Sequence, residues 1–142
     1  MKKILSLMLL VLMVQVAMAQ TELTGKWQTM KKGKPQSTIE IFKGDDGLYY
    51  GKVVDLADPS RKNAVYKFDG PDKGKKIIGL VVVKNMKYSD GKMTGGTITD
   101  PQNGKTYYAS LKYNAKTKEC DLRGSIDKMG VLGRTEHWKR LP

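Results

Sequence analysis

The chain has 142 residues, of which 26 are lysine or arginine and 14 are aspartate or glutamate, for a formal net charge of +12. This length is enough for one domain with one hydrophobic core and too short for two. A single cysteine excludes an internal disulfide, and the alternation of Cys120 with Leu122 and Ile126 predicts a buried, inert thiol.

The first element in chain order is an expected export signal, residues 1–19. Lys2 and Lys3 precede an apolar run that ends in the small-x-small pattern accepted by signal peptidase. Because the run is too short to span a bilayer comfortably, we expect cleavage rather than an anchored helix. The expected mature domain, residues 20–142, is soluble and periplasmic or secreted. Its formal net charge falls from +12 to +10, because two lysines and no acids are removed.

Lysine supplies most of the positive charge, and only four of the 26 basic residues are arginine. Planar, bidentate recognition of phosphate favours arginine, so nucleic acid is not an expected partner. A solvated lysine-rich surface is the simpler interpretation of this charge. Weak attraction to anionic envelope surfaces is the alternative.

From Thr24 onward the hydrophobic pattern has a period of two, and turn residues punctuate it at regular intervals. This predicts antiparallel strands joined mainly by short hairpins, with strong turns at residues 45–47, 89–91 and 103–104. The expected strands cover residues 24–30, 37–43, 48–55, 80–86, 93–99, 106–113, 119–126 and 132–140.

One long connection, from Asp55 to Lys76, interrupts this rhythm. Connections of this length are unusual in compact domains and are often functional. Because it carries Val65, Tyr66 and Phe68 as side chains to bury, we expect a packed flap or an irregular strand.

An eight-stranded meander would leave two exposed edges, which closure into a barrel removes. The predicted fold class is therefore all-β, an antiparallel up-and-down β-barrel of about eight strands. Gly95 and Gly96 fit a bulge or a tight corner of such a barrel. Asp100 and Pro101 should end the strand that contains these glycines, because proline cannot donate to the ladder.

A hydrogen-bonded turn is the preferred interpretation of the polar residues that follow this strand. The alternative is a polar cluster at a barrel mouth, formed by Asp100, Asn103 and Lys105.

Gly25-Lys26-Trp27 in the first strand, together with arginines in the last, resembles the lipocalin and fatty-acid-binding barrels. In those barrels a tryptophan closes one end and an arginine packs over it, which implies that Trp27 is the plug. Arg134 and Arg140 are both candidates for the arginine. Arg134 is the predicted partner because it lies within the strand pattern. A cation–π contact there would stabilise the fold rather than form a functional site.

A second resemblance covers most of the chain after residue 24. The motifs that carry it are Gly25-Lys26-Trp27, Leu48-Tyr49-Tyr50-Gly51-Lys52, Ile77-Ile78-Gly79-Leu80, Gly95-Gly96-Thr97-Ile98-Thr99-Asp100-Pro101, Asn103-Gly104-Lys105-Thr106-Tyr107 and Leu132-Gly133-Arg134-Thr135-Glu136-His137-Trp138. In these the chain is similar to the bacterial exported family catalogued as domain of unknown function 2147. The resemblance implies a lipocalin-like barrel of the cell envelope, with no established activity. Structural roles are expected for Gly25, Trp27, Gly95, Gly96, Asp100, Pro101, Arg134 and Trp138.

The sequence offers no arrangement of reactive residues that predicts catalysis. His137 is the only histidine, and it faces opposite to Glu136 and Trp138, where an outward or hydrogen-bonded ring is expected. One histidine, one cysteine and scattered acids do not make a metal site. Neither a nucleophile elbow nor a phosphate-binding loop occurs. We therefore predict no enzyme activity, no metal and no cofactor.

Two interpretations of function stay open. In the first, the barrel binds a small apolar or anionic amphipathic ligand, in a pocket lined by Val82, Ile98, Tyr107, Leu111 and Leu122. In the second, side chains fill the barrel, and its outer surface is a structural or protein-interaction module of the cell envelope. The first is preferred on fold analogy alone.

Overall fold

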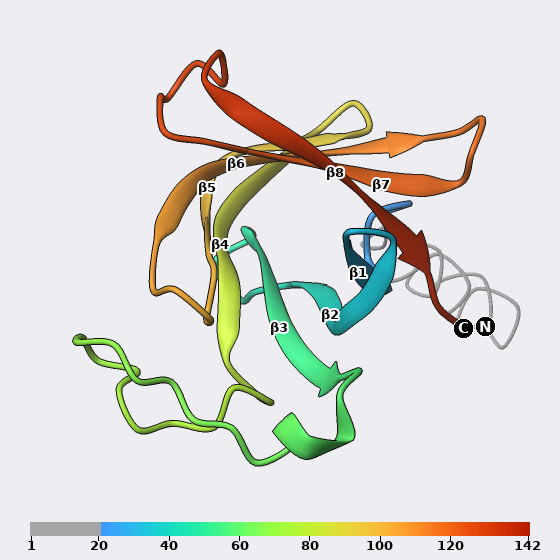
Figure 1. Ribbon diagram of the computed structural model, residues 1–142. Helices are drawn as coiled ribbons and strands as arrows, with labels where there is room; N and C mark the ends of the chain where they lie inside the picture. Colours follow the sequence, from blue (N-terminus) through green and yellow to red (C-terminus); the bar gives the residue numbers. More distant parts are fainter. Residues whose placement is uncertain (1–20) are drawn as a thin grey trace, which may run out of the picture.

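The computed structural model describes residues 21–142, and the predicted export signal lies outside them. Eight antiparallel strands pair in chain order, and the last pairs with the first, which closes a barrel (Figure 1). The predicted all-β barrel is therefore confirmed. Within residues 21–142, no helix has the length and apolar character needed to cross a bilayer. The strands are β1 Gly25–Lys31, β2 Lys34–Lys43, β3 Tyr49–Leu56, β4 Val81–Ser89, β5 Lys92–Thr99, β6 Thr106–Asn114, β7 Glu119–Ser125 and β8 Gly133–Arg140.

Two of the hairpins have turns of two residues with positive φ, at positions 32–33 and 90–91. Such turns match the twist of the flanking strands, so they keep neighbouring strands paired up to the turn. The turn predicted at 89–91 is confirmed. Pro35 lies between the expected strands 24–30 and 37–43 but belongs to β2, next to a shift of register after Thr29. Proline is tolerated there because the ladder is already interrupted.

The glycine pair of β5 lies at a bulge. The register between β5 and β6 shifts between Met93 and Gly96, and Gly95 has a φ of +82°. A Cβ at Gly96 would overlap the carbonyl oxygen of Lys84 and the sulfur of Met86. The backbones of β4 and β5 can therefore approach this closely only because residue 96 has no side chain.

One end of the barrel is packed solid. The indole of Trp27 lies in this packed end, and its Nε1 donates a hydrogen bond to the carbonyl oxygen of Leu23, 2.9 Å away. Residues 21–24 thus close the barrel from outside the sheet. The side chains that are fully buried at this end are Leu23, Trp27, Met86, Met93, Leu111 and Cys120.

Cys120 is buried on the same face as Leu122, as the alternation predicted. Burial raises the pKa of its thiol to about 12, so the reactive thiolate is not formed at neutral pH. Ile126 is not buried with them; it is 69% exposed, because β7 ends at Ser125 and Ile126 lies in the loop that follows.

The arginine over the plug is Arg140, not the predicted Arg134. Its guanidinium carbon lies 4.0 Å from the centroid of the Trp27 ring. The pairing of β1 with β8 places Trp27 directly opposite Arg140. Arg134 lies near the other end of β8, opposite Gly124, and therefore cannot reach the plug.

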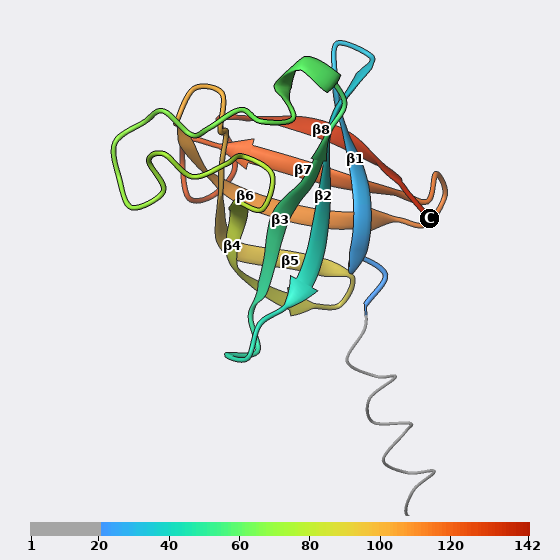
Figure 2. The same cartoon turned by 90° about the horizontal axis from the view of Figure 1, so that it is seen from below.

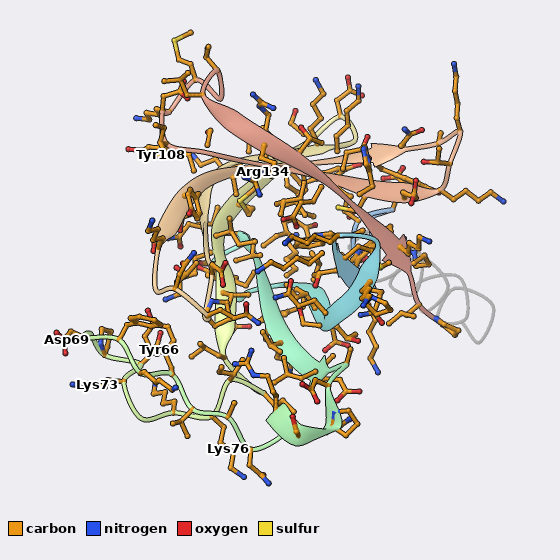
Figure 3. All side chains as sticks on the ribbon, viewed as in Figure 1. Tyr66, Asp69, Lys73, Lys76, Tyr108 and Arg134 are labelled. Atoms are coloured by element: carbon orange, nitrogen blue, oxygen red, sulfur yellow. The ribbon has the colours of Figure 1, made fainter. Side chains whose placement is uncertain are left out.

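The long connection between β3 and β4, residues 57–80, is a packed flap that projects beside the barrel (Figures 2 and 3). It contains one short 3₁₀ helix, η1 Pro59–Arg61. Tyr66 is buried and packs edge-on against Phe68 with 5.5 Å between ring centroids. Val65 is exposed, because alternation turns it away from these two rings. A Cβ at Gly104 would overlap the Phe68 ring, so the flap is seated on the turn between β5 and β6.

Candidate functional site

The end of the barrel opposite the Trp27 plug contains an open cavity of about 550 Å³. Pockets for small molecules usually occupy about 300–1,000 Å³, so one small ligand would fit. The strands supply an apolar wall because every second side chain faces inward. The apolar lining includes Ile39, Val53, Ile77, Val82, Ile98, Tyr107, Leu122 and Trp138.

Four of the five predicted pocket residues line this cavity, namely Val82, Ile98, Tyr107 and Leu122. Leu111 does not, and it is fully buried instead. Leu111 is outside the cavity because β6 runs from the mouth toward the packed end of the barrel. Leu111 follows Tyr107 on this strand and therefore lies in the packed end. Ligand binding by any of the five stays a prediction.

Charged side chains gather at the mouth of the cavity. Lys31 comes from the end of β1, Arg61 from η1 in the flap, and Arg134 from the start of β8. Figure 3 shows Arg134 on β8, away from the flap residues that it also labels. Within residues 21–142, the Arg134 guanidinium makes no hydrogen bond or ion pair. Asp100 and Glu136 supply the acidic groups of the lining.

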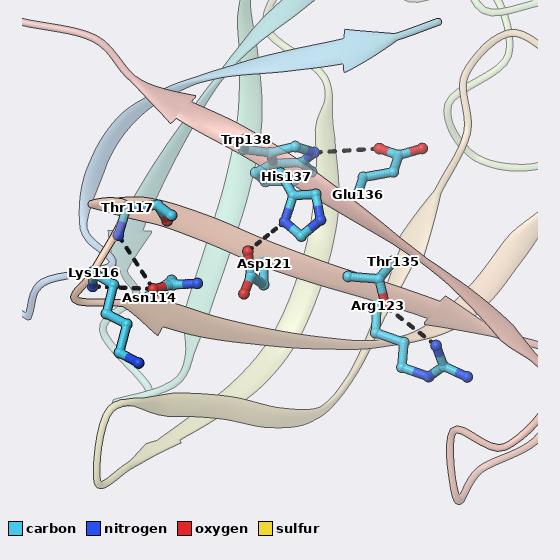
Figure 4. Close-up of polar contacts among 9 residues, drawn as sticks. All are labelled: Asn114, Lys116, Thr117, Asp121, Arg123, Thr135, Glu136, His137 and Trp138. Atoms are coloured by element: carbon cyan, nitrogen blue, oxygen red, sulfur yellow. Dashed lines mark hydrogen bonds and ion pairs between the residues drawn. The ribbon is translucent and has the colours of Figure 1, made fainter. Parts of the chain in front are cut away.

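Glu136 is a cavity residue that sequence analysis did not single out. It is half-buried, and its Oε2 accepts a hydrogen bond from the Trp138 indole Nε1 at 3.3 Å (Figure 4). Arg134, Glu136 and Trp138 all line the cavity, since they alternate along the inner face of β8. This alternation could have predicted that Glu136 faces the cavity. Trp138 is expected to face the interior, and Glu136 lies two residues before it on the same face.

The residues after β5 form a hydrogen-bonded turn, and some of them also lie at the cavity mouth, so both interpretations of this segment apply. The Asp100 carboxylate accepts from the backbone N–H of Gln102, and Asn103 Oδ1 accepts from that of Lys105, each at 2.8 Å. These bonds are those of a tight polar turn. Asp100 and Asn103 also line the cavity mouth, whereas Lys105 does not.

His137 lies on the outer face of β8, away from the cavity. Its Nδ1 is 2.6 Å from Asp121 Oδ1 on β7 (Figure 4), and this hydrogen bond raises the pKa of the imidazole. The geometry is that of an exposed cross-strand pair rather than of a general base in a cleft. In the described part of the chain, no three His, Cys, Asp or Glu side chains come close enough together to hold a metal ion.

Comparisons with known proteins agree on the fold. No curated protein matches this chain. The structure of protein HP1028 from the human pathogen Helicobacter pylori, described as belonging to the lipocalin family, is similar with a TM-score of 0.76 and 28% sequence identity. The similarity covers 87% of this chain and 85% of that one. A family model described as "uncharacterized protein conserved in bacteria (DUF2147)" matches residues 25–140. The chain therefore belongs to this bacterial family, whose fold is here a lipocalin-like barrel.

Proposed function

We propose that this protein binds one small, anionic, amphipathic molecule in the open end of its barrel and works as a carrier outside the cytoplasm. The observation that carries the proposal is the cavity of about 550 Å³, with its apolar wall and its charged mouth. An apolar chain gains free energy by leaving water for such a wall, at roughly 25 cal/mol for each Å² buried. The charged mouth then holds the polar end of the ligand.

The packed half of the barrel supports this proposal over a barrel that is filled throughout. Trp27 and the buried side chains around it form a rigid floor, so the open half keeps its shape without a ligand. The similarity to a protein of the lipocalin family points the same way, because eight-stranded barrels of this size can hold one small ligand.

The expected chemistry of the ligand follows from the mouth. Among residues 21–142 the Arg134 guanidinium has no hydrogen-bond or ion-pair partner, so it is available for a carboxylate or phosphate. Glu136 lines the cavity and uses one carboxylate oxygen to accept from Trp138, which leaves acceptor capacity for a ligand. A ligand that combines an anionic group with a hydroxyl or amine donor would pair with both residues.

Export is part of the proposal and depends on the pattern of residues 1–19. N-terminal sequencing of protein from a periplasmic or culture fraction tests it directly. The expected first residue is Gln20. A chain that keeps Met1 in the cytoplasmic fraction would contradict this part of the proposal.

Gly124 provides a sharp test of binding inside the barrel. It lines the cavity, and the nearest atoms to an added Cβ would be Cβ of Tyr107 at 3.7 Å, Cγ2 of Ile98 at 3.9 Å and Cγ of Tyr107 at 4.0 Å, which are ordinary contacts. Gly124→Leu should therefore fill the cavity without breaking the wall. Thr94→Leu is the control, since it places the same leucine side chain at an exposed position of β5.

Native mass spectrometry should show a retained ligand on the wild type and on Thr94→Leu, but not on Gly124→Leu. In titrations with a fluorescent fatty acid, Arg134→Gln should weaken binding about tenfold, because one charge-assisted contact is lost. The same variant should leave binding of the corresponding fatty alcohol unchanged. Empty wild-type preparations from the native envelope, together with no binding of fatty acids, would contradict the carrier.

A further inference from the structure

Exposed apolar side chains gather in the loop between β7 and β8, residues 126–132, which we call the lip. Of the six large hydrophobic side chains that are exposed within residues 21–142, four lie in the lip: Ile126, Met129, Val131 and Leu132. Met129 is 90% exposed and Val131 73%. A fifth, Tyr108, is paired with Ser125 at the base of the lip, and Figure 3 labels it there. Apolar groups gathered in this way indicate an interaction site.

Hydrogen bonds within the loop fix the backbone of the lip, which carries these exposed side chains. The carboxylate of Asp127 accepts hydrogen bonds from the backbone N–H groups of Val131 at 2.9 Å and Leu132 at 2.7 Å. These bonds lower the pKa of Asp127, so its negative charge is satisfied by the loop itself. Ile126 N–H donates to the Leu132 carbonyl oxygen at 3.0 Å, and Gly130 N–H donates to that of Asp127 at 3.2 Å.

Arg123, on the outer face of β7, holds the other side of the lip. Its Nε donates to the carbonyl oxygen of Gly130 at 2.6 Å, and its Nη2 donates to that of Val131 at 3.1 Å. Its Nη1 donates to Thr135 Oγ1 on β8 at 3.2 Å (Figure 4). Several backbone groups of the lip are thus paired within the protein, while the side chains of Met129 and Val131 are largely exposed. This pairing lowers the cost of contact with hydrocarbon, since unpaired backbone groups are costly there.

The lip is continuous with the mouth of the cavity. Ile126 and Leu132 belong to the cavity lining as well as to the lip. Lys128 lies within the lip, and the cations of the mouth lie on the same end of the barrel. The chain as a whole carries a formal net charge of +12. An apolar loop with Lys128 within it and with Lys31, Arg61 and Arg134 at the same end of the barrel complements a membrane surface that carries anionic lipids.

We propose that the lip inserts its apolar side chains into a bilayer containing anionic phospholipids, with the cavity mouth against the membrane surface. A bilayer needs no shape-complementary groove, which suits four side chains that project from one loop. A stable protein interface uses about 20–30 residues a side, far more than the lip contains. This geometry would also let an amphipathic ligand pass between membrane and barrel without crossing water, a consequence that rests on the proposed function.

A tryptophan placed in the lip reports insertion directly. The probe is a vesicle of phosphatidylglycerol and phosphatidylcholine with brominated acyl chains, which quench nearby indoles. Met129→Trp should be quenched beyond the wild type, whose Trp27 and Trp138 are buried. Val65→Trp, at an exposed apolar position in the flap, is the matched control and should not be. Quenching of the control and not of the lip variant would overturn the proposal.

Removal of the apolar side chains tests whether they carry the binding. The double variant M129S/V131S should reduce partition into the same vesicles by about tenfold, whereas Val65→Ser should leave it unchanged. Circular dichroism and thermal melting check that both variants are folded. Gly124→Leu should bind vesicles like the wild type, so failure of the carrier proposal can be distinguished from failure of this one.

Two outcomes would overturn the membrane proposal. Equal vesicle binding by M129S/V131S and the wild type, abolished by salt in both, would assign the attraction to surface lysines alone. Self-association that is lost in M129S/V131S, measured by sedimentation and without any vesicle binding, would assign the lip to a second copy of the chain.

Discussion

The Arg140 guanidinium lies over the face of the Trp27 indole, with 4.0 Å between its central carbon and the ring centroid. The same group donates hydrogen bonds to the carbonyl oxygens of Thr24, at 2.6 Å, and Glu22. Gly25 makes this approach possible, because its φ is +107° and a Cβ there would lie 2.9 Å from Arg140 Nη1. One side chain therefore joins the last strand, the first strand and the segment that covers the plug.

Replacing this arginine should destabilise the protein. Arg140→Ala should lower the free energy of unfolding by about 1–3 kcal/mol, because it removes a cation–π contact and two charge-assisted hydrogen bonds. Arg134→Ala, on the same strand without such contacts, should change it by less than about 0.5 kcal/mol. Urea titrations of the two variants check this, and equal losses would show that Arg140 does not stabilise the plug.

Two glycines of the barrel should respond in opposite ways to the same substitution. A Cβ at Gly96 would overlap backbone of β4, whereas a Cβ at Gly124 would make ordinary contacts beside the cavity. We expect Gly96→Ala to cost about 1–3 kcal/mol or more through forced backbone shifts. Gly124→Ala should be neutral or stabilising by up to about 1 kcal/mol. Thermal melting of both variants measures these changes in stability. A Gly96→Ala variant as stable as the wild type would contradict the close approach of β4 and β5.

Cys120 should be inert in the folded protein. Burial raises the pKa of its thiol to about 12, and the nearby charge of Asp121 acts in the same direction. A thiol reagent should therefore react only after unfolding, because the thiolate is the nucleophile. Reaction with a chromogenic disulfide, with and without urea, measures this. Rapid labelling without denaturant would mean that the sheet opens locally near β7.

The pair formed by His137 and Asp121 should give a small, defined pH dependence. The hydrogen bond to Asp121 raises the pKa of His137 above 6.5, so folding favours the protonated ring. Its contribution to stability is present below that value and is lost as pH rises through the higher pKa of the folded state. Because the ring is exposed, the effect is small.

An NMR titration of the His137 ring measures this pKa. Asp121→Asn should return it toward the ordinary value. An unchanged pKa in that variant would exclude the hydrogen bond as the cause.

Alternation of side chains was enough to predict the strands, because burying one face of a sheet imposes a period of two. The segment predicted at residues 106–113, for example, is β6 Thr106–Asn114. β2 begins earlier than predicted, since Pro35 is typical of a turn but lies beside a bulge. Local patterns thus predicted where the strands lie. The start of β2 was mispredicted because proline occurs both in turns and beside bulges.

Features that depend on register between distant strands could not be predicted in the same way. Arg134 and Arg140 both fit the sequence pattern, and only the pairing of β8 with β1 decides between them. The extent of the cavity along β6 also depends on side chains of distant strands, and it includes Tyr107 but not the buried Leu111. The contact of Phe68 with Gly104 is a further example. It joins the flap to the turn between β5 and β6, and the sequence pattern of neither segment predicts it.

The junction between β1 and β8 also has a consequence for biosynthesis. It consists of two residue pairs, Trp27 with Arg140 and Gln28 with Lys139, drawn from opposite ends of the described chain. Until the final strand leaves the ribosome, the growing polypeptide can form hairpins but cannot complete the barrel. Contacts this distant form late, since the intervening chain must be ordered first. The closed barrel is therefore a property of the finished chain, and its cooperative stability begins only when the last strand has been made.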